Sequence, residues 1–387
     1  MKWKFYSLAF VAGMSILSAC SSDDNNDNDG NGNGNEIENG TILKGTITSD
    51  VTLASGNTYK LSGEYIVEEG ATLHIEEGVK IIAVYDDIAD YILVKQGGKI
   101  NAVGTPDKPI VMTSEKEEPG AWGGIHICGR AHTNAEGGKG SSEIGGAVYG
   151  GNDDADNSGT LQYIRLEYTG FAFDEEHEAN GISFYGVGNG TIVDHCQAYK
   201  GSDDGFEFFG GSVNVSNLVA VSCSDDSFDW TEGWNGKGTN LVAYQEDKST
   251  LGYGCDCLME CDNNGSNTAA TPVAHPVLKN LILVGNGGSK QGIRLRAGTE
   301  VEIDNAKVCG KGQPLTVETA LTENALKNGT SKLTNITLTS ELSSKEGIYT
   351  HADFIAVTSN KVAANLSYIS FEDIRKECSW MNGSWVK

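Results

Sequence analysis

"GSDDGFEFFGG" at residues 201–211 and "CSDDSFDWTEG" at residues 223–233 repeat one pattern 22 residues apart. Each stretch contains Ser-Asp-Asp, a small residue, and then an acidic residue between two aromatic ones. Related short runs occur as "GISFYG" (181–186), "LMECDN" (258–263) and "GIRLRA" (292–297). The central residue of each run is polar and its neighbours are apolar. This alternation predicts β-strands that bury one face.

The five runs place one polar residue each at an equivalent position: Ser183, Glu207, Asp229, Glu260 and Arg294. The steps between these residues are 24, 22, 31 and 34. A period near 22 to 24 with longer excursions indicates a solenoid in which each coil adds one strand to a shared sheet. Leucine-rich repeats share this period, but their leucine and asparagine signature is absent. We therefore predict an all-β fold, a right-handed parallel β-helix (solenoid) with end caps and inserted loops.

Composition supports this class and excludes another. The chain of 387 residues holds 50 glycines and only 6 prolines, which favours many tight turns between short strands. With 28 basic and 53 acidic residues, its formal net charge is −25. Nucleic-acid phosphates would repel such a surface, so we exclude nucleic acid as a partner.

The N-terminal stretch "MKWKFYSLAFVAGMSILSAC" predicts export rather than structure. Two lysines precede an apolar run that is too short for a permanent membrane span, so we interpret residues 1–19 as a signal peptide. The end of this stretch, Leu17-Ser18-Ala19-Cys20, resembles a lipobox, in which Cys20 would be acylated. The alternative is an ordinary cleavable signal in which the cysteine is coincidental.

Residues 20–40 hold almost no apolar side chains and predict a flexible acidic tether, which leaves residues 41–387 for the β-helix domain. Ser21-Ser22-Asp23-Asp24 resembles the acidic export signal of lipoproteins that face the cell exterior. We expect a lipid-anchored outer-membrane protein displayed on the surface. A generic linker on a periplasmic lipoprotein is the alternative.

Eight cysteines remain after Cys20, an even number that permits disulfides without demonstrating them. In "GCDCLMECDNN", a strand period of two would place Cys255, Cys257, Met259 and Cys261 on one face, toward the core. A zinc site is disfavoured because no second closely spaced Cys or His pair follows.

The equivalent positions of Glu207, Asp229 and Glu260 predict a ladder of carboxylates about 4.8 Å apart on neighbouring strands. Like charges at that distance repel, and a cation would relieve the repulsion. Oxygen ligands of this kind suit Ca²⁺. The predicted metal ligands are Asp203, Asp204, Glu207, Asp225, Asp226, Asp229 and Glu260. The alternatives are that the Ser-Asp-Asp segments are only turn formers and the ladder only a solvated polar face.

Two aromatic residues, Tyr185 and Phe209, each follow a ladder position by two residues and so lie on the same outward side. Together with Arg294 and Arg296 they could bind a sugar. Cover by the loop around residues 246–275 is the alternative.

Three longer stretches carry a resemblance to a known family: "PGAWGGIHICGRAHTN" (119–134), "YGGNDDADNSGTLQYIRLEYTG" (149–170) and "GVGNGTIVDHCQAYKGSDDGFEFFGG" (186–211). They resemble secreted and outer-membrane bacterial proteins with pectate-lyase-like β-helix architecture, as does the terminal "CSWMNGSWVK". The resemblance covers most of residues 41–387. It implies a fold and a location, but no set of catalytic residues.

Three functions remain open. The first is a surface protein that binds a glycan or other nutrient, with Ca²⁺ and without an organic cofactor, beside a TonB-dependent outer-membrane transporter. The second is a polysaccharide lyase or glycoside hydrolase, for which Glu207, Asp229, Glu260 and Arg294 are the catalytic candidates. The third is a structural or adhesive surface protein. The acidic charge and the few basic residues near the ladder favour the binding protein over the enzyme.

Overall fold

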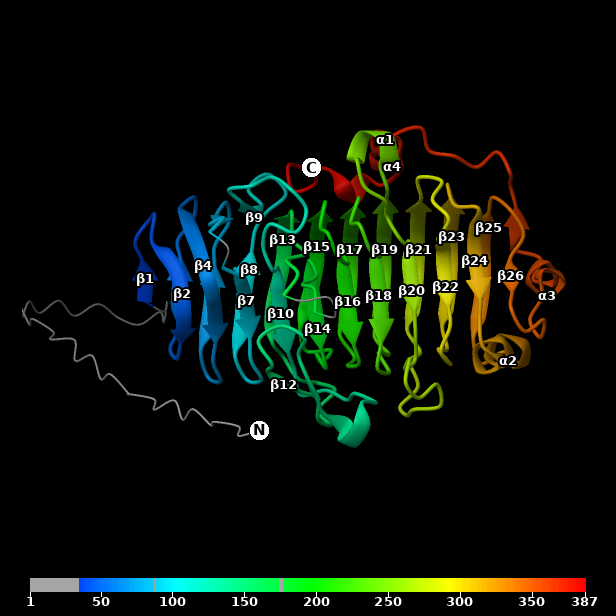
Figure 1. Ribbon diagram of the computed structural model, residues 1–387, viewed down its shortest axis with the longest axis horizontal. Coiled ribbons are helices and arrows are strands. Elements are labelled where there is room, and N and C mark those ends of the chain that lie inside the picture. The colour runs from blue at the N-terminus through cyan, green and yellow to red at the C-terminus, as the bar shows by residue number, and fades with distance from the viewer. Residues whose placement is uncertain (1–34, 87, 174–176) are drawn as a thin grey trace, which may run out of the picture. The chain divides into compact units, whose positions relative to one another are not determined.

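The computed structural model describes residues 35–86, 88–173 and 177–387. These residues form a stack of coils, and each coil contributes strands to parallel sheets that run along the stack (Figure 1). The predicted right-handed parallel β-helix is confirmed. No described helix is long and apolar enough to cross a membrane.

One sheet carries the repeat found in the sequence, and we call it the acidic sheet. Its strands pair in parallel in the order listed, and β7 also pairs with β4 of the first coils. They are β7 (Tyr91–Val94), β10 (Ile125–Cys128), β14 (Ile182–Tyr185), β16 (Phe206–Phe209), β18 (Phe228–Thr231), β20 (Met259–Cys261), β22 (Gln291–Leu295), β24 (Gln313–Val317) and β26 (Ser343–Ser344).

The return path of most later coils is a longer strand that bends in its middle, and the last coil has only the two-residue strand β27 (Lys361–Val362). These strands also stack in order: β13 (Gly159–Glu167), β15 (Ile192–Tyr199), β17 (Asn214–Val221), β19 (Lys237–Tyr244), β21 (Val277–Val284), β23 (Glu302–Cys309), β25 (Lys332–Leu338) and β27 (Lys361–Val362). In the first coils two stacks take this path. They are β1 (Asn35–Ile37), β3 (Val51–Leu53), β5 (Thr72–Ile75) and β8 (Lys99–Val103), and β2 (Ile42–Ile47), β4 (Thr58–Val67), β6 (Lys80–Ala83) and β9 (Ile110–Ser114). Both stacks join the two halves of β13.

An asparagine makes the bend in five of the long strands. Asn217, Asn240, Asn280, Asn305 and Asn335 all have positive φ, between 55° and 63°. Asparagine tolerates this left-handed conformation better than most residues. The amides of successive coils also hydrogen-bond one another: Asn240 Nδ2 donates to Asn217 Oδ1 at 2.8 Å, Asn280 Nδ2 to Asn240 Oδ1 at 3.0 Å, and Asn305 Nδ2 to Asn280 Oδ1 at 2.8 Å. We call the hydrogen-bonded side chains of Asn217, Asn240, Asn280 and Asn305 the amide row.

The inward side chains form stacks along the axis. Phe206 stacks on Phe228 at 5.6 Å between ring centroids, and Phe208 lies between Phe184 at 5.0 Å and Trp234 at 4.1 Å. All five rings are buried. The alternation inferred from the sequence therefore corresponds to an apolar interior and a polar outer side on the acidic sheet.

Helices and inserted segments cover parts of the solenoid. They are α1 (Lys248–Leu251), α2 (Ala320–Asn328), α3 (His351–Ala356), α4 (Phe371–Glu377), the 3₁₀ turns η1 (Glu136–Gly138) and η2 (Ser379–Met381), and the hairpin β11 (Gly140–Ser141) and β12 (Val148–Tyr149). α2 and α3 lie at the C-terminal end of the stack (Figure 1). The segment with α4 and η2 runs back and packs on outward apolar residues of β17–β23, such as Val242 and Ile282.

At this level one predicted boundary changes, and the question of disulfides that the sequence left open is answered. Strand β1 begins at Asn35 and pairs with β3, so the solenoid starts before residue 41, within the predicted tether. Ile37 packs against the core, which explains why this short segment adds a strand. The eight cysteines after Cys20 are all free and buried, so the described residues contain no disulfide.

Candidate cation-binding cleft

The equivalent polar positions lie side by side in the predicted register. Ser183 pairs with Glu207, Glu207 with Asp229, Asp229 with Glu260, and Glu260 with Arg294. Ser183 also pairs with His126 of β10, a buried histidine that the strand alignment missed. His126 lies in "GIHICG" (124–129), which has the same pattern as "GISFYG" and could have been found from it.

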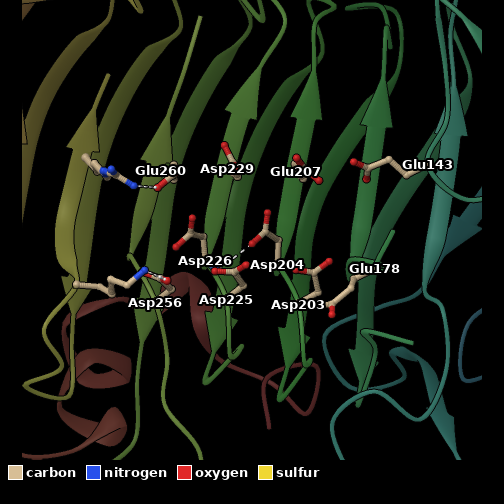
Figure 2. A pocket seen from close by; sticks show the side chains of 12 residues that line it. Glu143, Glu178, Asp203, Asp204, Glu207, Asp225, Asp226, Asp229, Asp256 and Glu260 are labelled. Carbon is tan, nitrogen blue, oxygen red and sulfur yellow. Dashed lines mark hydrogen bonds and ion pairs between the residues drawn. The ribbon is translucent and has the colours of Figure 1, made fainter. Parts of the chain in front are cut away.

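A cleft of about 500 Å³ opens over this row, and ten carboxylates line it (Figure 2). Seven of them are the predicted metal ligands: Asp203, Asp204, Glu207, Asp225, Asp226, Asp229 and Glu260. The other three, Glu143, Glu178 and Asp256, come from inserted segments and were not predicted. Two basic residues, Lys290 and Arg294, complete the lining.

The Ser-Asp-Asp segments place a second row of carboxylates below the first. Each precedes a strand, and the second aspartate of each holds the next coil. Asp204 Oδ1 accepts a hydrogen bond from the Asp226 backbone N–H at 2.8 Å, and Asp226 Oδ1 accepts one from the Cys257 N–H at 2.5 Å. Both aspartates are buried. Each aspartate therefore joins its coil to the next one and also lines the cleft, which is more than the local turn-forming role of the alternative interpretation.

Burial and mutual repulsion raise the pKa values of these acids. Burial comes first, and neighbouring carboxylates add to it. The pKa of Asp203 is raised to about 7 and that of Asp225 to about 6. The pKa values of four further acids lie well above the usual range: Asp204, Glu207, Asp226 and Asp229. The cleft therefore favours anything that neutralises its charge, either a proton or a cation.

The carboxylates form overlapping groups that fit a cation. Ligand atoms lie within 4.8 Å of one another in Asp203–Asp204–Asp225, in Asp204–Glu207–Asp229 and in Asp226–Asp229–Glu260. Asp204 and Asp229 each belong to two of these groups. Moreover, Asp229 Oδ1 is buried and has no hydrogen-bond partner among the described residues. A buried carboxylate oxygen without a donor is costly, and a bound cation would satisfy it.

The basic residues near the row are already paired. Arg294 contacts Glu260 at 2.8 Å and Glu318 at 3.3 Å, and Lys290 pairs with Asp256. Arg296 pairs with Glu260 and contacts Asp262 at 2.7 Å, and it does not line the cleft. Although burial acts in the opposite direction, the bonds to Glu318 and Glu260 raise the pKa of Arg294. This does not favour Arg294 as a catalytic base.

The expectation that Tyr185 and Phe209 form an exposed sugar-binding face is wrong. They stack on each other at 4.4 Å and are buried, at 0% and 7% exposure. They lie on the outer side of the sheet, as predicted, but the segment around the β11–β12 hairpin covers them, and Tyr149 lies 5.2 Å from Tyr185. The cover is therefore not the loop at residues 246–275.

The cysteine-rich segment also differs from the expectation. Only Met259 and Cys261 lie in a strand and face the core. Cys257 precedes the strand, so the period of two does not hold there. Its Sγ lies 3.5 Å from Asp256 Oδ1, and with Asp226 and Asp256 it forms a further group of possible metal ligands. The predicted lipid attachment residue, Cys20, lies outside the described residues.

A comparison with protein-family models agrees with this architecture. The model described as a pectate-lyase-like beta helix domain matches residues 45–386. No curated protein and no solved structure matches the chain. The match spans nearly all of the solenoid, including every strand of the acidic sheet. The chain therefore belongs to the family of pectate-lyase-like β-helix domains.

Proposed function

We propose that the cleft binds Ca²⁺ and, through it, an extracellular ligand such as a glycan. The observation that carries the proposal is the buried, unpartnered oxygen of Asp229 within two overlapping carboxylate groups. Ca²⁺ takes six to eight oxygen ligands and tolerates irregular geometry, which a set of carboxylates from several coils and loops can supply. Glu207, Asp229 and Asp204 would hold one ion, and Asp226 and Glu260 would extend the site along the row.

A cation would also give the cleft a way to bind a ligand. Ten carboxylates repel an acidic molecule, and among the described residues only two basic side chains of the lining offset them. Bound Ca²⁺ would reduce this repulsion and leave coordination positions for hydroxyl or carboxylate oxygens. We favour a capture protein over an enzyme because the two basic residues of the cleft, Arg294 and Lys290, are already paired with carboxylates.

The location of the protein is part of the same proposal. We infer that a lipid on Cys20 anchors the domain to the outer membrane, facing the exterior, where a glycan or other nutrient could pass to a TonB-dependent transporter. The N-terminal sequence supports this inference, with its apolar run, its lipobox-like end and its acidic tether.

Calorimetric titration of the purified protein with CaCl₂ tests the proposal. We expect binding by the parent protein and its loss in the double variant Glu207→Gln/Asp229→Asn, which keeps side-chain size. A control variant, Glu76→Gln/Glu77→Gln, makes the same charge change outside the cleft and should bind like the parent. Absence of binding, or equal binding by the cleft variant, would refute the cation site. Glycan binding measured with Ca²⁺ and with chelator then tests the second step.

A further inference from the structure

A second cavity, of about 190 Å³, lies away from the acidic cleft, at the bend of β19, β21 and β23. The C-terminal segment that carries α4 and η2 forms its other wall. Figure 1 shows this segment running along the solenoid over the ends of these long strands. The cavity lining includes Asn240, Asn280, Asn305, Lys307, Glu377 and Trp380.

The three asparagines hold fixed positions. Each occupies the left-handed conformation that bends its strand, and hydrogen bonds join their amides from coil to coil at 2.8 to 3.0 Å. Successive amides are therefore spaced by one strand separation, about 4.8 Å. The amide side chains are therefore already ordered before a ligand binds to them.

The amides keep hydrogen-bonding capacity after forming the row. A side-chain amide has two N–H donors and an oxygen with two lone pairs, and the row uses one donor and one acceptor of Asn280. Asn305 Oδ1 accepts no hydrogen bond within the described chain. Asn280 and Asn305 are both exposed, so these groups face the cavity and solvent.

An aromatic ring and an aliphatic floor complement the amides. Trp380 is half-buried, and its ring lies 6.2 Å from that of the fully buried Trp385. Ile282, which pairs with Lys307 of the next coil, is part of the lining. An aromatic ring beside fixed polar groups offers an apolar surface for C–H groups and directed bonds for hydroxyls.

The charge of this cavity differs from that of the cleft. Its two charged side chains, Lys307 and Glu377, form an ion pair with each other. Tyr368 OH also donates to Glu377 at 2.8 Å. The lining is therefore close to neutral, and it offers neither a cation site nor an excess of positive charge for an anion.

We propose that this cavity binds a single neutral sugar ring. Neutral amides at fixed spacing match neighbouring hydroxyls, and Trp380 supplies the surface for the ring's C–H face. The cavity is smaller than the 300–1,000 Å³ or so of typical ligand pockets, which limits it to about one ring. This site is independent of Ca²⁺ and of the function proposed for the acidic cleft.

The test uses saturation-transfer NMR on the purified protein with the methyl glycosides of glucose, galactose, mannose and xylose. We expect at least one of them to bind in the millimolar range and to change tryptophan fluorescence. Trp380→Leu and the double variant Asn280→Gly/Asn305→Gly should weaken binding by about tenfold or more. Glycine keeps the positive φ of the bend and removes only the amide.

Matched controls separate recognition from folding. Asn335→Gly makes the same change at the same bend, in a coil that does not line the cavity, and should bind like the parent. All measurements are made in chelator, which removes any Ca²⁺-dependent binding at the acidic cleft, and binding at this cavity should persist under that condition. Binding by none of the four glycosides up to tens of millimolar would overturn the proposal. Binding that survives both cavity variants, or that is lost equally in Asn335→Gly, would also overturn it.

Discussion

Two rows of polar side chains run along the coils of this solenoid, and they differ in whether neighbouring side chains of the row can hydrogen-bond one another. The row on the acidic sheet holds Glu207, Asp229 and Glu260 in neighbouring strands. The amide row holds Asn240, Asn280 and Asn305 at the bend of the long strands. Each row takes one residue from each successive coil, at the spacing that parallel pairing imposes.

The difference lies in the chemistry of the side chains. An amide both donates and accepts, so stacked asparagines hydrogen-bond one another instead of repelling, as the bonds from Asn280 to Asn240 and from Asn305 to Asn280 show. A carboxylate only accepts, so a stack of them repels and leaves oxygens such as Asp229 Oδ1 without a partner. A repeated amide can therefore stabilise a β-helix by itself, whereas a repeated acid needs a proton or a cation.

The largest expected effect is that stability falls as pH rises, which is the reverse of what carboxylates with lowered pKa values produce. Seven acids of the cleft have raised pKa values: Glu143, Asp203, Asp204, Glu207, Asp225, Asp226 and Asp229. Above their unfolded pKa values near 4, the folded chain holds more protons than the unfolded chain, so stability falls as pH rises. In chelator, we expect the Tm to fall on the order of 5 °C between pH 5.5 and 8.

Saturating Ca²⁺ sharpens this prediction. A cation replaces the protons, so it should raise the Tm more at pH 8 than at pH 5.5 and flatten the profile. Scanning calorimetry at both pH values, with and without Ca²⁺, measures the change. A Tm that rises with pH in chelator would contradict the assignment of the cleft as a strained cluster of charges.

The next largest effect is expected for Asp229→Asn, whose effect on the free energy of unfolding should change sign when Ca²⁺ is added. Asp229→Asn removes a charge and gives the row a donor, so without a cation it should stabilise the fold by about 1–2 kcal/mol. In saturating Ca²⁺ the same variant should be less stable than the parent, because it has lost a ligand. Thermal unfolding in chelator and in Ca²⁺ gives both values. Destabilisation under both conditions would mean that Asp229 has a purely structural role.

The converse substitution tests the amide row. Asn280→Asp keeps a residue that tolerates positive φ, but it cannot donate to Asn240 Oδ1. We expect a loss of about 1 kcal/mol at pH 7, measured as a lower Tm. Asn280→Gly is the control for the amide without the added charge. An unchanged Tm in Asn280→Asp would show that the hydrogen bonds between the amides contribute little to stability.

These two rows also show what a sequence can predict. The acidic row was predictable in its register because each strand repeats a local pattern, one polar residue between inward apolar ones, and aligning the patterns aligns the strands. The amide row was missed, although its signal is present. "SNLV" (216–219), "TNLV" (239–242) and "KNLI" (279–282) place asparagine before the same apolar position in three coils.

Other parts of the site have no such signal. Glu143, Glu178 and Asp256 reach the cleft from inserted segments, whose path depends on how they fold over the sheet and not on any period. The burial of Tyr185 has the same cause. Alternation correctly assigned its side of the strand, but only the hairpin that packs on it decides that this side is closed to solvent.

The smallest effect is expected for Asn335, the last of the five asparagines at the bend, because its amide contacts a carboxylate. Asn335 Nδ2 donates to the carboxylate Asp304 Oδ1 at 2.6 Å instead of to an asparagine, and Thr334 Oγ1 donates to the same oxygen at 2.9 Å. Asn335→Gly should therefore cost only about 0.5 kcal/mol, since Thr334 still satisfies Asp304 and glycine keeps the bend. Thermal unfolding at pH 7 measures it. A loss of stability as large as that of Asn280→Asp would mean that the Asp304 carboxylate depends on the Asn335 amide. A single acid in this solenoid would then be as sensitive to a lost partner as the amide row itself.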